Sequence, residues 1–213
     1  MSYGVLDVYY IVDCPQDDDY IESFQYSLQE TLVASNHQGR DWDIRFNLLT
    51  CGKAPKLYQL EHGMPVPALT GEKKFYIGGA LRLLAEALEN NDATSKYCPV
   101  IVFGSPRFPY DDFVDELYHL KHSKYYDEAV KIGLSLGGSY SYPLMKLLCK
   151  YDEAIITTSD LSLFGRLFNV KEKIREEYIL VKVDPPGHGE DAPLTGDVIL
   201  PPDGDIPGDD EGW

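Results

Sequence analysis

Short apolar runs recur along the chain and predict a series of buried strands. The first run, Val-Leu-Asp-Val-Tyr-Tyr-Ile-Val at residues 5–12, is almost continuous, which is typical of a strand that is buried on both faces. Similar runs follow, bounded by glycine, proline or aspartate. The ranges that we expect to be strands are Val5–Val12, Trp42–Thr50, Lys56–Leu60, Pro99–Phe103, Ala129–Leu136, Ala154–Thr157 and Tyr178–Val183.

Between these runs, apolar residues recur at spacings of three and four, which predicts amphipathic helices. Asp17, Asp18 and Asp19 precede the first stripe, where carboxylates cap a helix and favour the positive end of its dipole. We expect Asp111 or Asp112 to cap a later helix. The stripes are Ile21, Phe24, Leu28 and Leu32; Ile77, Leu81, Leu84 and Leu88; Phe113, Leu117 and Leu120; Leu144, Leu147 and Leu148; and Leu163, Leu167 and Phe168. This alternation predicts an α/β, Rossmann-like fold with a mostly parallel central sheet and helices on both faces.

Composition divides the chain into a folded domain, residues 1–183, and a C-terminal tail, residues 184–213. The tail holds six prolines, six glycines and nine acidic residues, with no lysine or arginine. Such a segment buries too little apolar surface to offset its ordering entropy, so we expect an acidic, disordered tail. Trp213 is an apolar anchor in it, either a chance aromatic or part of a short motif that docks on a partner.

Charge and cysteine content limit the partners and the cellular compartment that we expect for this protein. Nineteen basic residues against 35 acidic ones give a net charge of −16. We therefore expect neither nucleic acid nor an anionic membrane as a partner, because both repel such a field. No apolar run is long enough to span a bilayer and no secretory signal is evident, so we expect a cytoplasmic protein. Four separated cysteines without a CxxC pair favour free thiols over a zinc site.

Candidate chemistry lies in the loops after the strands, because open α/β sheets bind ligands beyond the carboxyl ends of their strands. Asp13 closes the first strand, which suits a metal ligand or a nucleophile. Asp17 follows in the same loop, and Ser105 follows the strand that begins at Pro99.

The order of these features resembles a von Willebrand factor A (VWA) domain, and most closely the bacterial TerY-like proteins named for tellurium resistance. The matching stretches cover most of residues 5–170, and the Gly-Gly-Ala-Leu helix entry and the Gly-Ser-Pro after a strand are the more specific ones. They are Val8-Tyr-Tyr-Ile-Val-Asp13, Ile21-Glu-Ser23, Gly78-Gly-Ala-Leu-Arg-Leu-Leu84, Val100-Ile-Val-Phe-Gly-Ser-Pro106 and Ala154–Phe168.

The resemblance implies a metal-ion-dependent adhesion site, which this chain matches only in part. The family pattern has Asp-x-Ser-x-Ser after the first strand, a threonine before the Gly-Ala-Leu helix and an aspartate after the fourth strand. Here Asp13 is present, the serines are missing, and Phe75 or Tyr76 stands at the threonine position. Mg²⁺ needs a complete oxygen shell, so we expect a degenerate site and no cofactor; any residual Mg²⁺ would depend on Asp13, Asp17 and Ser105.

Tyrosine and phenylalanine side chains collect near the same edge and suit protein recognition. The predicted function is a non-enzymatic protein-interaction module in a bacterial signalling or stress-response assembly, and the TerY-like resemblance implies a kinase and a metal-dependent phosphatase as partners. The residues expected to contact a partner are Asp13, Asp17, Tyr76, Ser105, Phe108, Tyr110, Tyr140 and Trp213.

Two alternatives stay open at this point. In the first, a residual adhesion site centred on Asp13 binds an acidic partner residue through Mg²⁺. In the second, Asp13 is the nucleophile of a phosphotransfer enzyme, although Pro15 stands where dehalogenase-type phosphatases have a second aspartate.

Overall fold

The computed structural model describes residues 4–34, 42–61, 63–90, 98–136, 140–149 and 151–159. The strands in these ranges are β1 (Gly4–Val12), β2 (Trp42–Thr50), β3 (Lys56–Leu60), β4 (Val100–Ser105), β5 (Val130–Leu136) and β6 (Ile155–Thr158). They form one sheet in the order β3-β2-β1-β4-β5-β6. All neighbours pair in parallel except β3, which runs antiparallel to β2. The α/β class with a mostly parallel sheet is therefore confirmed.

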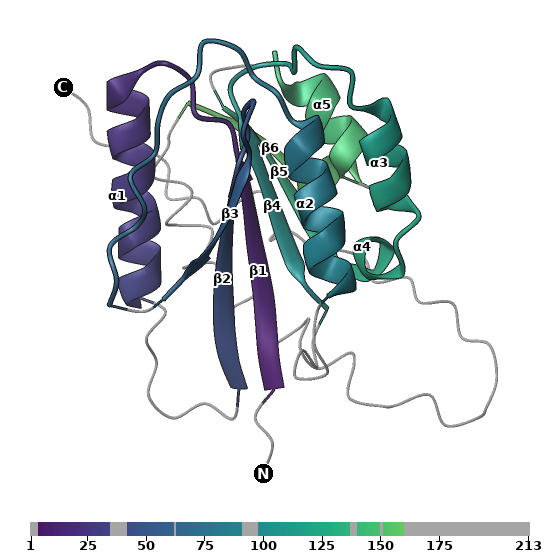
Figure 1. Ribbon diagram of the computed structural model, residues 1–213, viewed down its shortest axis with the longest axis horizontal. Helices are drawn as coiled ribbons and strands as arrows, with labels where there is room; N and C mark the ends of the chain where they lie inside the picture. The colour runs from purple at the N-terminus through teal and green to yellow at the C-terminus, as the bar shows by residue number, and fades with distance from the viewer. Residues whose placement is uncertain are drawn as a thin grey trace, which may run out of the picture.

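Helices cover both faces of the sheet. They are α1 (Asp18–Ala34), α2 (Gly78–Glu89), α3 (Val114–Lys121), α4 (Lys124–Glu128) and α5 (Tyr142–Leu148), with a 3-10 turn at Asp152–Ala154. Among the described elements, α1 lies on one face and α2 to α5 lie on the other (Figure 1). The sequence did not predict α4, because a helix of five residues is too short to show an apolar period.

The core lies in two layers, one on each side of the sheet. Along β1, Tyr9 and Ile11 face the helices α2 to α5, whereas Tyr10 and Val12 face α1. All four side chains are almost fully buried. Burial on both faces explains why the first apolar run is nearly continuous rather than alternating.

Helix capping differs in one respect from the sequence prediction. The Asp112 carboxylate accepts a bond from the Val114 N–H at 3.3 Å, next to the start of α3. Asp111 instead accepts from the N–H groups of Ile77 and Gly78, at 3.0 and 2.8 Å. Asp111 therefore caps α2, from a loop more than 30 residues later in the sequence, and not the helix that follows it.

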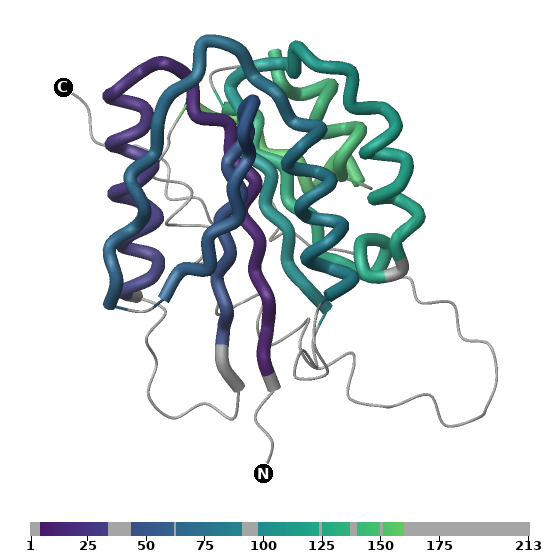
Figure 2. Tube along the Cα trace, viewed as in Figure 1, coloured from purple at the N-terminus to yellow at the C-terminus, as the bar shows by residue number. Residues whose placement is uncertain are grey.

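A long loop after β3 carries the chain from one face of the sheet to the other. It first runs beside α1, where Gln25 and Gln29 bond to the backbone of Pro67 and Val66 at 3.0 and 2.9 Å. It then crosses the carboxyl edge of the sheet and enters α2 (Figure 2). Where it crosses, the Glu72 N–H donates to the Cys14 carbonyl at 2.8 Å. This crossing places residues 72–77 over the end of β1.

Some predicted features lie outside the described residues. They are the helix marked by Leu163, Leu167 and Phe168, the strand Tyr178–Val183, the boundary between residues 183 and 184, the acidic tail and Trp213. Across the ranges that are described, the helices are too short or too polar to cross a membrane.

Candidate functional site

The site at the carboxyl edge is built on the adjacent ends of β1 and β4. The Asp13 N–H donates to the Gly104 carbonyl at 3.0 Å and so extends the pairing of these strands by one residue. This contact brings Ser105 beside Asp13, with 3.1 Å between its Oγ and the Asp13 Oδ2. Both residues are buried, with 2% of Asp13 and 1% of Ser105 exposed. Sequence analysis placed these two residues at one edge, and the structure brings them into contact.

Arg107 forms a bidentate ion pair with the Asp13 carboxylate. Its Nε lies 2.8 Å from Oδ2 and its Nη2 lies 2.5 Å from Oδ1. This parallel two-bond geometry is the strongest form of an arginine–carboxylate pair. The hydrogen bonds to Asp13 raise the pKa of the Arg107 guanidinium, which therefore stays charged. A cation supplied by the chain itself thus neutralises the buried aspartate.

Arg107 also ties the crossing loop to the sheet. Its Nη1 donates to the backbone carbonyls of Glu72 and Lys73, at 3.1 and 2.9 Å. The backbone N–H of Arg107 donates to the Ser105 Oγ at 3.0 Å. Four of the five guanidinium N–H groups are therefore used within the domain. Arg107 acts as a clamp that holds three segments of the edge together.

The donor set around Asp13 does not fit the divalent ion that the family resemblance implies. Both carboxylate oxygens already accept from a guanidinium, and a fixed positive charge repels a second cation. Asp17 is exposed and uses its Oδ1 to cap α1, accepting from the Tyr20 N–H at 3.0 Å. Across the described part of the chain, no cluster of three or more His, Cys, Asp or Glu residues is arranged to hold a metal. Ser105 remains as a hydroxyl donor, which is far short of six oxygen ligands.

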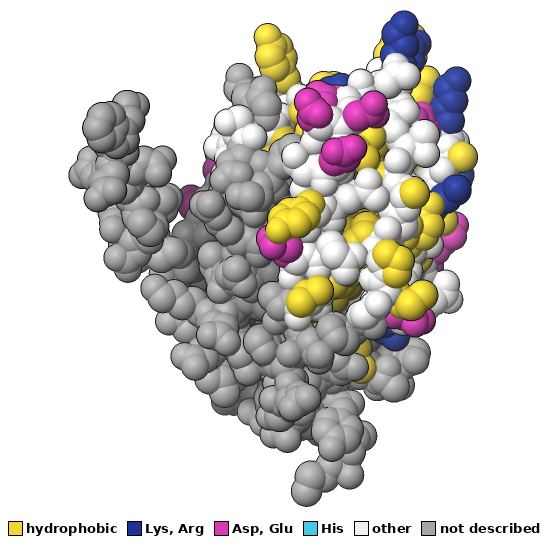
Figure 3. All heavy atoms as spheres, turned by 90° about the vertical axis from the view of Figure 1, so that its left-hand side faces the viewer, with side chains coloured by type: hydrophobic (Ala, Val, Ile, Leu, Met, Phe, Trp, Pro, Cys, Tyr) yellow, Lys and Arg dark blue, Asp and Glu magenta, His cyan; other side chains and the backbone are white. Residues whose placement is uncertain are grey.

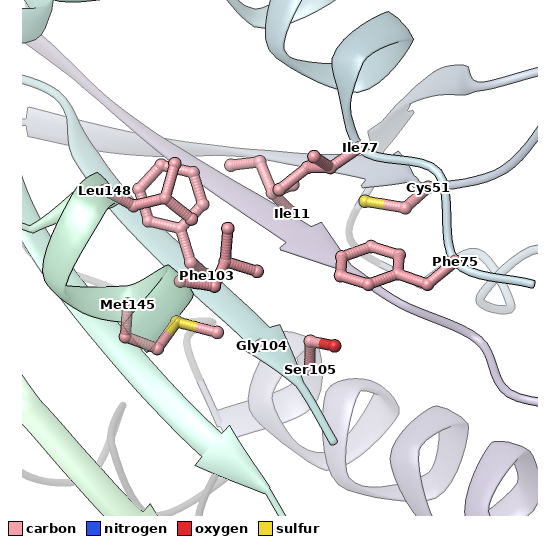
Figure 4. Close-up of a pocket in the computed structure, with 10 residues that line it drawn as sticks. Ile11, Cys51, Phe75, Ile77, Phe103, Gly104, Ser105, Met145 and Leu148 are labelled. Carbon is pink, nitrogen blue, oxygen red and sulfur yellow. The ribbon is translucent and has the colours of Figure 1, made fainter. Parts of the chain in front are cut away.

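An aromatic ring fills the space beneath the edge. Phe75, one of the two residues that the resemblance places at the threonine position, is 3% exposed. Figure 4 shows its ring between Ile11 and Ser105, with Phe103 and Met145 on the other side of the hollow. The side chains that line this hollow leave no space for a water molecule between them. The hollow is therefore packed core and not a ligand cavity.

Buried serines continue the polar network towards α5. The Ser141 Oγ donates to the Ser105 carbonyl at 2.5 Å and lies 2.9 Å from the Ser135 Oγ. These contacts join the ends of β4 and β5 to the start of α5. They satisfy polar groups that would otherwise be costly to bury.

A second cluster, which we call the lysine–tyrosine rim, lies on the loops beside Arg107. It consists of Lys53, Lys73, Lys74, Tyr76 and Tyr110. The Tyr76 and Tyr110 rings meet edge to face, with centroids 6.0 Å apart. The Lys74 Nζ lies 3.5 Å from the centroid of Tyr110, and the Lys53 Nζ lies 5.9 Å from that of Tyr76. Cations and ring faces therefore alternate along the rim.

The other predicted contact residues are scattered along the edge. Phe108 is 49% exposed and packs edge to face on Phe113, with centroids 6.4 Å apart. Tyr140 is 80% exposed and precedes α5. Phe103, in β4, is 1% exposed and belongs to the core.

Cys14 lies next to Asp13 and is buried. Burial, followed by the charge of Asp13, raises the pKa of the Cys14 thiol to about 12. A thiol of this kind is mostly protonated near neutral pH and is a poor nucleophile. Cys14 is therefore a packing residue of this edge.

Sequence reasoning missed Arg107, Lys53 and Lys74. Arg107 left a signal only on the condition that Asp13 is buried, because a buried aspartate needs a cation and Arg107 comes two residues after β4, the strand beside it. Lys53 and Lys74 left none, since solvent-exposed lysines are common and their loops are far apart in sequence.

Comparison with known proteins supplies fold relatives only. No protein-family model matches the chain, and no curated protein matches it. Among solved structures, proximal thread matrix protein 1 from the mussel byssus aligns with a TM-score of 0.56 at 10% identity, over 79% of this chain and 47% of that one. Another structure of that protein aligns with a TM-score of 0.54 at 12% identity, over 79% of this chain and 47% of that one. That structure is described with a zinc-occupied MIDAS motif, the metal-ion-dependent adhesion site.

Two microbial structures are similar to the same degree. The ArnB paralog VWA2 from Sulfolobus acidocaldarius has a TM-score of 0.56 at 16% identity, over 77% of this chain and 44% of that one. The pilus adhesin SpaC from Lactobacillus rhamnosus GG, in its open conformation, has a TM-score of 0.58 at 12% identity, over 84% of this chain and 31% of that one. The chain thus spans less than half the length of these neighbours. At such low identity they show the fold alone, and that fold is the α/β fold of VWA domains.

Proposed function

We propose that this chain is a non-enzymatic, VWA-type protein-interaction module whose carboxyl edge binds a partner without a divalent cation. The observation that carries the proposal is the Arg107 guanidinium on the Asp13 carboxylate. In a metal-dependent site, an uncompensated carboxylate is available to a cation. Here the carboxylate is already neutralised, so any partner must be held by side chains.

The surface around Arg107 has the residue types that such binding needs. Phe108, Tyr110 and Tyr140 are 49%, 66% and 80% exposed. Tyrosine is enriched at the energetic centres of protein interfaces, because its ring buries a large apolar area while its hydroxyl finds a polar partner. Arg107 holds the crossing loop to the sheet, which limits the entropy lost when the edge binds.

The wider assembly is inferred from the TerY-like resemblance. That resemblance supports a cytoplasmic role in bacterial signalling or stress response, beside a protein kinase and a metal-dependent phosphatase. We propose these two proteins as partners, with no nucleic acid, membrane or cofactor involved. The net charge of −16 supports the exclusion of nucleic acid and anionic membranes.

The test combines metal titration with partner binding. Calorimetry with Mg²⁺ and Mn²⁺ is expected to show no saturable binding to the full chain. A protein kinase and a metal-dependent phosphatase from the native host are expected to co-purify with the chain in EDTA. Tyr110→Ala should weaken this association. Tyr118→Ala on α3 should not, and it is a matched control because Tyr118 is 60% exposed and Tyr110 is 66% exposed.

Other outcomes would replace the proposal. Saturable Mg²⁺ binding that Asp13→Ala abolishes, together with partner binding that EDTA abolishes, would establish the residual adhesion site with Asp13, Asp17 and Ser105. Turnover of a phosphoester that depends on Asp13 would establish the phosphotransfer enzyme. Equal loss of binding in the Tyr110 and Tyr118 variants would remove the carboxyl edge as the contact surface.

A further inference from the structure

The lysine–tyrosine rim concentrates positive charge on a strongly acidic chain. Its three lysines are all exposed, and the backbone contacts of two of them hold their loops together. The Lys53 N–H donates to the Glu72 carboxylate at 3.3 Å, and the Lys73 carbonyl accepts from Arg107 at 2.9 Å. Basic side chains gather along one upper edge of the face in Figure 3, beside a separate group of acidic ones.

The rim lysines have no acidic partner within the described ranges. The ion pairs formed there are Asp7–Arg45, Asp13–Arg107 and Lys146–Asp152, and none involves the rim. Lys74 instead contacts the Tyr110 hydroxyl, which raises the pKa of the lysine and lowers that of the tyrosine. The three lysine side chains are exposed and therefore open to an anionic ligand, beside the paired rings of Tyr76 and Tyr110.

One segment of the same chain has the complementary chemistry. Residues 203–213 carry five acidic side chains and a tryptophan, and the 30 residues from 184 onward contain no lysine or arginine. Carboxylates suit the rim lysines, and an indole suits the exposed side chain of Tyr110 and the half-buried ring of Tyr76 beside it. The segment thus matches both components of the rim.

Chain length allows the contact within one molecule. β6 runs parallel to β5 and therefore ends, at Thr158, on the same edge of the sheet as the rim. Residue 203 comes 45 positions later. Of these positions, residues 184–202 belong to the tail that the sequence predicts and span up to about 60 Å when extended, enough to cross a small domain, and tethering gives an effective concentration up to the millimolar range.

We infer that the lysine–tyrosine rim binds the acidic segment 203–213 of its own chain. The bound segment covers Tyr110 and so competes with the partner that we place at this edge. The inference rests on the proposed function for its consequence, because covering the edge regulates binding there. The contact itself does not depend on any partner.

The test is zero-length cross-linking of the full chain with a carbodiimide, which joins an amine to a carboxylate only when the two are in direct contact. Peptide mass spectrometry is expected to find bonds from Lys53, Lys73 or Lys74 to the acidic residues of 203–213. A mixture of ¹⁵N-labelled and unlabelled protein distinguishes bonds within one chain from bonds between copies. Raising the salt to about 0.5 M should suppress the products, because exposed ion pairs are screened.

Charge reversal tests the assignment. The double variant K53E/K73E, which keeps the amine of Lys74, should lower the yield of the products from Lys74 roughly tenfold, since attraction becomes repulsion. Lys121→Glu on α3 is the control and should leave the yield unchanged; Lys121 is likewise exposed. Circular dichroism shows whether each variant is folded.

Three results would overturn the inference. They are cross-links from the segment that favour Lys121 over the rim, cross-links found only between copies, and no segment cross-links in the folded protein. None of these results bears on whether a partner binds in EDTA, so failure of this inference is distinguishable from failure of the proposed function.

Discussion

Replacing Arg107 with alanine should destabilise the domain mainly through the aspartate that it leaves behind. The side chain of Asp13 is 2% exposed, and without Arg107 its carboxylate keeps one side-chain hydrogen bond, from Ser105. Removing one member of a buried ion pair typically costs about 3–5 kcal/mol. The Arg107 side chain is 27% exposed, so water can enter its place and the cost should lie at the lower end, about 3 kcal/mol.

A double-mutant cycle separates this pair from the loss of loop contacts. Asp13→Ala should cost about 2 kcal/mol, because the freed guanidinium can reach water. The double variant should be more stable than the sum of the two losses predicts, by a coupling of about 2 kcal/mol. Urea unfolding followed by circular dichroism measures each free energy of unfolding. The residual cost of the double variant reports the bonds from Arg107 to the crossing loop.

The control is the ion pair between Lys146 and Asp152, whose side chains are 48% and 58% exposed. Lys146→Ala should cost less than about 1 kcal/mol, as exposed pairs do. The reasoning is refuted if the Asp13 and Arg107 losses simply add, or if Arg107→Ala costs no more than Lys146→Ala. It is refuted equally if Mg²⁺ stabilises the wild-type domain against urea and Asp13→Ala removes that effect.

Three further predictions concern the loops and the buried thiols. Asp111→Ala should lower the free energy of unfolding by about 1–2 kcal/mol, because it removes both cap bonds of α2, while Asp112→Ala should cost less; thermal unfolding compares the two. Gly71→Ala should destabilise the crossing loop, because a Cβ there would lie 2.5 Å from the Pro15 carbonyl; hydrogen exchange at residues 72–77 should increase. Burial raises the pKa of the Cys14 and Cys149 thiols from 9.0 to about 12. The protonated thiols therefore contribute to the free energy of unfolding fully below pH 9, and this contribution is lost as the pH rises towards 12. Urea unfolding between pH 8 and 11 should show the decline.

The sheet was predictable because each of its strands carries a local signal. β2 and β3 occupy the predicted ranges, and the other strands differ from prediction by one or two residues at an end. β4 extends to Ser105, past Gly104, because its backbone pairs with Ser135 of β5. Nothing in the local sequence shows that pairing, so the end of the strand depends on its neighbour.

The site was predictable only where residues are adjacent to strand ends. Asp13 and Ser105 meet because parallel strands end at one edge, a property of the fold class. Arg107 follows by electrostatics once Asp13 is known to be buried, but the sequence does not show that burial. The contacts between Lys53, Tyr76 and Tyr110 join three separate loops, and only the path of the crossing loop brings them together.

The pairing of buried carboxylates explains why the end of β1 offers no free aspartate to a cation. Asp7 and Asp13 are the buried carboxylates among the described residues, and each forms a bidentate pair with an arginine. Asp7 pairs with Arg45, which lies directly opposite in β2, whereas Asp13 recruits Arg107 from a loop. Because both aspartates are thus compensated, the field at the carboxyl edge is set by the exposed groups around it. These groups include the rim lysines and also the exposed aspartates Asp17, Asp18 and Asp19 at the start of α1. Asp13 therefore differs from a site that holds a cation on free carboxylates through its own arginine partner, and not through the sign of the whole edge.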